Sequence, residues 1–81
     1  IDAQLRLKLI EEGLESNNYE QVRLAAHSLK GASANIGALI LAQLCEQLEH
    51  DCKLQKYSDL DTLVINVSEE LSIINKELLI T

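Results

Sequence analysis

Ala-His-Ser-Leu-Lys-Gly-Ala-Ser-Ala-Asn-Ile-Gly-Ala, residues 26–38, is the stretch from which the fold and the function of this chain are best inferred. His27 is followed by Lys30 after three residues and by Gly31 after four. Positions i, i+3 and i+4 share one face of an α-helix. A helix here therefore places a cation and a bare stretch of backbone directly beside one imidazole ring.

The spacing of the apolar and small residues predicts which way this ring points. They follow the i, i+3, i+4, i+7 pattern of a core-facing stripe, made of Val22, Ala25, Ala26, Leu29, Ala32, Ser33 and Ile36. His27 and Gly31 lie roughly opposite, so the ring should face outward or lie in a shallow groove beside a neighbouring helix. A glycine inside a helix costs about 1 kcal/mol relative to alanine. Gly31 thus favours a surface that another molecule approaches closely.

Apolar residues recur at helical spacing along the whole chain and predict four helices, over residues 2–15, 19–36, 38–54 and 59–79. Leu5 and Leu9 widen the apolar face of the first helix. The inward positions expected in the third helix are Ile40, Leu41, Leu44, Cys45, Leu48 and Cys52. Short connections between amphipathic helices favour an all-α antiparallel up-down-up-down four-helix bundle. With 81 residues, the chain is expected to form a single domain over residues 1–81.

Residues with capping chemistry stand at the expected helix ends. Asn18 followed by Gln21 fits a capping box at the start of the second helix, and Ser58 with Asp61 forms a weaker one at the start of the fourth. Gly37 is a candidate left-handed C-cap. Asn35 either belongs to that helix end or is a helical residue near the face of His27, and both interpretations stay open.

Composition excludes several classes of function. The net charge of −6 argues against nucleic acid or an anionic membrane as a partner, and no apolar run approaches the roughly 20 residues of a membrane span. Cys45 and Cys52 should lie about 10 Å apart on one helix, too far for a disulfide, so we expect reduced, half-buried thiols in a cytoplasmic protein. There is no glycine-rich phosphate loop for ATP and no ligand set for a metal ion.

The run around His27 resembles the histidine phosphotransfer (HPt) domain, whose pattern is Ala-His-x-Leu-Lys-Gly followed by small residues and Gly-Ala. The matching residues here are Ala26, His27, Leu29, Lys30, Gly31, Ala32, Ser33, Gly37 and Ala38. The resemblance continues on the next helix, with Leu41, Leu44, Leu48, Glu49 and Lys53 at the family's spacings. It covers roughly residues 5–80.

The resemblance implies a phosphocarrier rather than an enzyme. His27 would take a phosphoryl group from an aspartyl phosphate on a response-regulator receiver domain and pass it to another receiver. Lys30 would offset the added charge, and Arg23 and Lys53 are further basic residues for the site. Glu49, where other members carry an amide, would accept the proton of the far ring nitrogen. The domain would need no cofactor of its own, because the receiver supplies Mg²⁺.

The resemblance also implies where partners bind. Gly31 and Ala34 would form the floor of a docking face flanked by Leu24 and Asn35. The expected partners are receiver domains, and also the kinase core if one belongs to the same chain. We expect a cytoplasmic domain, at the tail of a hybrid sensor kinase in a bacterium.

Four alternatives remain at this stage. A structural helical interaction module would leave His27 idle and would not explain Lys30 and Gly31 beside it. The phosphoacceptor domain of a chemotaxis kinase has a similar His-Ser-x-Lys-Gly run. The phosphoacceptor helix of a histidine kinase usually has an acidic residue after the histidine and a nearby proline, whereas Ser28 follows here and proline is absent. A helical metal protein would need Glu-x-x-His pairs, which we do not find.

Overall fold

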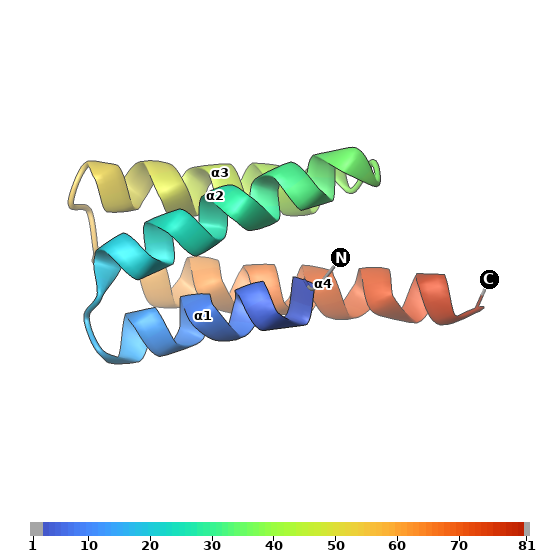
Figure 1. The fold of residues 1–81 in the computed structure, drawn as a ribbon, viewed down its shortest axis with the longest axis horizontal. Coiled ribbons are helices and arrows are strands. Elements are labelled where there is room, and N and C mark those ends of the chain that lie inside the picture. The colour runs from blue at the N-terminus through green and yellow to red at the C-terminus, as the bar shows by residue number, and fades with distance from the viewer. Residues whose placement is uncertain (1–2, 81) are drawn as a thin grey trace.

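The computed structural model describes the backbone of residues 3–80 and the side chains of residues 3–76. Over this part of the chain it shows four helices and no strand: α1 (Ala3–Glu15), α2 (Tyr19–Asn35), α3 (Leu39–Lys53) and α4 (Leu60–Ile80). They run alternately up and down, and each packs on the two helices next to it around the bundle (Figure 1). The predicted all-α four-helix bundle is confirmed.

The core is aliphatic, as the near absence of aromatic residues requires. Its largest fully buried side chains come from all four helices and include Ile10, Val22, Leu29, Leu41, Leu48, Leu60 and Val67. Cys45 and Cys52 are free thiols. Both are buried, whereas half-buried side chains were predicted. Burial raises the pKa of the Cys45 thiol to about 12, so this side chain packs as a small apolar group.

Asn18 caps the start of α2 as predicted, but only one of the two hydrogen bonds of a capping box is formed. The side chain of Asn18 accepts a hydrogen bond from the backbone N–H of Gln21 at 3.2 Å. The Gln21 side chain does not reach back to the Asn18 N–H, which donates instead to the Gly13 carbonyl at 2.8 Å. The Gln21 amide donates to the carbonyl of Leu9 at 2.8 Å and so ties α2 to α1.

The turn between α2 and α3 corrects two predictions of inward side chains. Gly37 has φ +75°, the predicted left-handed conformation, and Asn35 is the last residue of α2. Ile36 is the C-cap and is 53% exposed, because the chain leaves the helix before Ile36 reaches the core stripe. Ile40 is 60% exposed, because the first turn of α3 directs its neighbour Leu41 inward instead.

Smaller differences concern the helix ends. α3 begins at Leu39 and ends at Lys53, one residue inside each predicted limit, and α4 begins at Leu60 rather than 59. Ser58 lies in the turn before α4. The first residue of the predicted helix 2–15, Asp2, lies outside the described residues.

Gly13 is required by close packing, and its replacement provides a test of the fold. A Cβ atom at this position would lie 2.9 Å from Cγ2 of Val22 and 3.1 Å from the backbone oxygen of Asn18. We expect Gly13→Ala to lower the free energy of unfolding by about 1–3 kcal/mol, despite the better helix propensity of alanine. Chemical denaturation monitored by circular dichroism measures this, and a variant as stable as the parent would contradict the packing.

Candidate functional site

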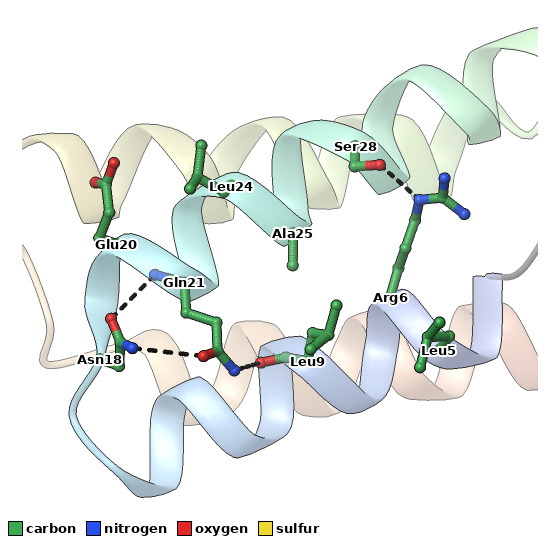
Figure 2. Close-up of a pocket in the computed structure, with 9 residues that line it drawn as sticks. All are labelled: Leu5, Arg6, Leu9, Asn18, Glu20, Gln21, Leu24, Ala25 and Ser28. Carbon is green, nitrogen blue, oxygen red and sulfur yellow. Dashed lines mark hydrogen bonds between the residues drawn. The ribbon is translucent and has the colours of Figure 1, made fainter.

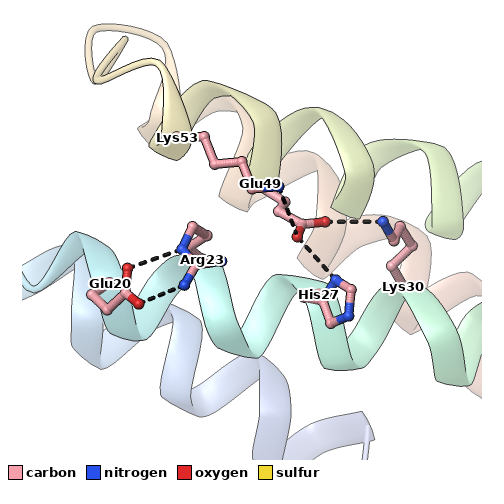
Figure 3. A network of polar contacts seen from close by, with 6 residues as sticks. All are labelled: Glu20, Arg23, His27, Lys30, Glu49 and Lys53. Atoms are coloured by element: carbon pink, nitrogen blue, oxygen red, sulfur yellow. Dashed lines mark hydrogen bonds and ion pairs between the residues drawn. The ribbon is translucent and has the colours of Figure 1, made fainter.

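His27 lies on the solvent side of α2 with one edge of its ring against α3. Its side chain is 64% exposed, and Nδ1 lies 2.9 Å from Oε2 of Glu49. The other ring nitrogen, Nε2, points away from Glu49 (Figure 3). The ring is thus held at one nitrogen and open to a visiting molecule at the other.

Glu49 is the buried centre of a small polar network between α2 and α3. Its side chain is only 8% exposed. Oε1 accepts a hydrogen bond from Nζ of Lys30 at 3.0 Å, and Oε2 lies 3.9 Å from Nζ of Lys53, one turn along α3. One carboxylate therefore faces the imidazole and two lysines (Figure 3).

The environment of Glu49 determines the tautomer of His27. Burial raises the pKa of the Glu49 carboxyl, but hydrogen bonds from Lys30 and His27 outweigh it, so that the net effect lowers the pKa. An ionised carboxylate only accepts hydrogen bonds, so the nitrogen facing it, Nδ1, is assigned as the protonated one. The neutral ring then carries its lone pair on Nε2, where it can attack an electrophile.

The lowered pKa of Glu49 also predicts how stability depends on pH. A carboxyl whose pKa is lower in the folded state stabilises the fold above its ordinary value of 4.5, and this contribution is lost as the pH falls through the folded value. As the pH is lowered from 5 to roughly 3, we expect the free energy of unfolding to fall less in Glu49→Gln than in the parent. Urea denaturation at several pH values measures the difference, and parallel pH profiles for the two proteins would contradict the assignment.

The other predicted basic residue, Arg23, is not brought to the ring. Its guanidinium forms a two-point ion pair with Glu20 one turn earlier on α2, with Nε 2.9 Å from Oε1 (Figure 3). A bidentate pair of this kind occupies the edge of the guanidinium that carries these two N–H donors. Lys53 does lie beside the site, through its contact with Glu49.

The residues predicted to form a docking face share one strip of α2. Leu24, His27, Gly31, Ala34 and Asn35 are all exposed, and we call them the α2 strip. Leu24 is 54% exposed, although it is a large apolar residue. A Cβ atom added at Gly31 would meet nothing within 4 Å, so the space above the backbone next to His27 is open.

Next to this strip, the structure shows an apolar groove that the sequence did not predict. The groove lies between α1 and α2, has a volume of about 650 Å³ and is walled by Leu5, Leu9, Leu24 and Ala25 (Figure 2). At the end nearer His27 along α2, Nε of Arg6 donates to Oγ of Ser28 at 2.5 Å. Leu5 and Leu9 were expected to widen the core face but are 51% and 38% exposed and line this groove instead.

On the other side of His27 is a smaller hollow between α2 and α3. It has a volume of about 210 Å³, and its lining includes Glu46 and His50 besides His27, Lys30, Glu49 and Lys53. Among the described residues, no three His, Cys, Asp or Glu side chains are grouped so that they could hold a metal ion. No described helix is both long and apolar enough to cross a membrane.

Comparison with known proteins agrees with this geometry. A family model of the Hpt domain matches residues 1–77. The fold is similar to the crystal structure of histidine-containing phosphotransfer protein B (HptB) from Pseudomonas aeruginosa PAO1, with a TM-score of 0.88 and 30% sequence identity. The match covers 90% of this chain and 64% of that one, so the chain spans less than two thirds of its length. No curated protein sequence matches significantly. A family model that covers nearly the whole chain, on a four-helix bundle with an exposed histidine, shows that the chain belongs to the Hpt domain family, the histidine phosphotransfer domains of phosphorelay signalling.

Proposed function

We propose that this domain is a phosphocarrier whose acceptor is Nε2 of His27. The observation that carries the proposal is the exposed ring held at Nδ1 by a buried, ionised carboxylate, 2.9 Å away. This contact leaves the Nε2 lone pair directed at solvent. A nucleophile of this kind suits an acyl phosphate, because the aspartate carboxylate is a good leaving group.

The neighbours of His27 have complementary roles in this proposal. A phosphoryl group on nitrogen adds nearly two negative charges, and Lys30, one turn along the same helix, offsets them. Lys53 adds positive charge at the edge of the hollow. Glu49 orients the ring and holds its tautomer, so it is a positioning residue rather than one that touches the phosphoryl group.

The partner in this proposal is a receiver domain of a response regulator. Its phosphorylated aspartate must come within bonding distance of Nε2, so its surface must cover the α2 strip. Gly31 and Ala34 present little side chain there, and the neighbouring groove between α1 and α2 offers apolar walls for the same partner. The receiver would also supply Mg²⁺ and the acidic side chains that bind it. We further propose that the domain works in the cytoplasm, where its thiols stay reduced, either alone or joined to a kinase core.

Transfer of labelled phosphate tests the proposal. The domain is incubated with Mg²⁺ and a panel of phosphorylated receivers, and separately with phosphoramidate as a small-molecule donor. We expect phosphate on the domain that is acid-labile and base-stable, the signature of a phosphohistidine. Absence of label from every receiver and from phosphoramidate would contradict the function.

A further inference from the structure

The contacts of Glu49 divide its two oxygens between two tasks. Oε2 holds the Nδ1 proton of His27, and Oε1 holds the ammonium of Lys30. Both residues come from α2, whereas Glu49 comes from α3 and is almost completely buried. Because the carboxylate is buried beside the ring, its charge acts on the ring before and after phosphorylation.

We propose that the negative charge of Glu49 keeps the proton on Nδ1 after His27 is phosphorylated, and that this makes the phosphohistidine a rapid donor to the next receiver. The inference rests on the proposed function and deepens it. It assigns to Glu49 control over how readily the phosphoryl group leaves, in addition to holding the free ring. The same carboxylate thus sets the reversibility of the carrier.

The bond changes show why this proton matters. In loading, the Nε2 lone pair attacks phosphorus, the bond between phosphorus and the aspartyl oxygen breaks, and aspartate leaves as a carboxylate. The Nδ1 proton takes no part, so the product ring is positively charged while that proton stays. In unloading, a carboxylate oxygen attacks phosphorus, the phosphorus–nitrogen bond breaks, and the ring leaves as neutral imidazole. If Nδ1 had lost its proton, the leaving group would be an imidazolate anion, which is far more basic and leaves slowly.

The charges around Glu49 strengthen its hold on the Nδ1 proton once His27 is phosphorylated. Before loading, Lys30 lies 3.0 Å from Oε1 and compensates part of the carboxylate charge. When Lys30 turns to the phosphoryl group, Glu49 keeps only the more distant Lys53 at 3.9 Å besides the ring. The carboxylate then holds the Nδ1 proton more firmly. Other charged or titratable groups around Glu49 include Arg23 on α2, which is paired with Glu20, and Glu46, His50 and the buried thiol of Cys45 on α3.

Glu49→Gln is the direct test, because glutamine keeps the shape of the side chain and removes its charge. The parent and the variant are phosphorylated with phosphoramidate, and the Nδ1 proton of the phosphohistidine is titrated by ¹⁵N and ³¹P NMR. An opposite charge at hydrogen-bond distance shifts a pKa by about one to three units. We therefore expect the pKa of the phosphohistidine to fall by about one unit or more in Glu49→Gln, and donation to a receiver to be roughly tenfold slower at a pH above both values.

Glu46→Gln is the matched control. Glu46 lies one turn before Glu49 on the same helix, lines the same hollow and is exposed to solvent. Its replacement removes an equal charge and leaves the contact between Glu49 and the ring intact. The pKa of the phosphohistidine in Glu46→Gln should therefore stay near that of the parent. Circular dichroism establishes that each variant is folded.

Lys53→Gln supplies a second test in the opposite direction. Without the lysine that lies 3.9 Å from Oε2, less positive charge offsets the negative charge of Glu49. The carboxylate should then hold the Nδ1 proton more firmly, and the pKa of the phosphohistidine should rise. An unchanged pKa in both Glu49→Gln and Lys53→Gln would overturn the inference while phosphorylation itself remained intact. Failure of the parent domain to take phosphate from phosphoramidate and from every receiver would instead overturn the proposed function.

Discussion

Replacing His27 with glutamine or alanine is expected to abolish phosphorylation of the domain completely. The reason is chemical, because neither side chain offers a nitrogen lone pair that can attack phosphorus. The fold should be unaffected, since the His27 side chain is 64% exposed and its partner Glu49 keeps its hydrogen bond to Lys30. The measurement is transfer of labelled phosphate from a phosphorylated receiver, with helicity and thermal unfolding recorded on the same samples.

The second histidine of the chain provides the control. His50 lies on α3 and lines the same hollow as His27, so His50→Gln changes an imidazole in nearly the same place. It should accept as much phosphate as the parent. Label that persists in His27→Gln and disappears in His50→Gln would move the acceptor to α3 and contradict the proposed site.

Gly31→Gln is expected to slow transfer from a receiver by roughly tenfold or more, while leaving the domain at least as stable. The substitution should not disturb the fold, because a Cβ atom added at Gly31 meets nothing within 4 Å inside the domain. Replacing a helical glycine removes a cost of about 1 kcal/mol. The longer side chain would instead occupy space that the receiver must enter to reach Nε2. Rapid-quench kinetics measure the transfer, and thermal unfolding measures the stability.

Two variants show whether the obstruction is local. Gly31→Ala should raise stability by a similar amount but obstruct the α2 strip much less than glutamine does. Ser72→Gln places the same side chain at an exposed position of α4 and should leave transfer unchanged. Equal transfer rates in the parent and in Gly31→Gln would remove the argument that a partner approaches closely at this glycine.

Features that depend on neighbours along the chain were predictable. The period of the apolar residues predicts the four helices. Asn18 caps the start of α2, and Gly37 adopts the left-handed conformation after its end, as their chemistry requires. The outward direction of His27 follows from the same period. Errors occurred where a helix meets a turn or another helix, at Ile36, Ile40, Leu5 and Leu9, because there the rotation of one helix against the next determines which apolar residue is buried.

By itself, the sequence determined the helix period, the caps and the placing of Lys30 and Gly31 beside His27, because these relations span a few residues and follow from helical geometry. The resemblance pointed to Glu49 as a partner of the ring, but only the tertiary structure placed this carboxylate, 22 residues away along the chain, 2.9 Å from Nδ1 of His27. It alone distinguished Gly13, which Val22 crowds, from Gly31, which stands in open space. The groove between α1 and α2 likewise became evident only from the tertiary structure. Contacts between helices depend on how their side chains interlock across the bundle, and one helical pattern is compatible with several such packings.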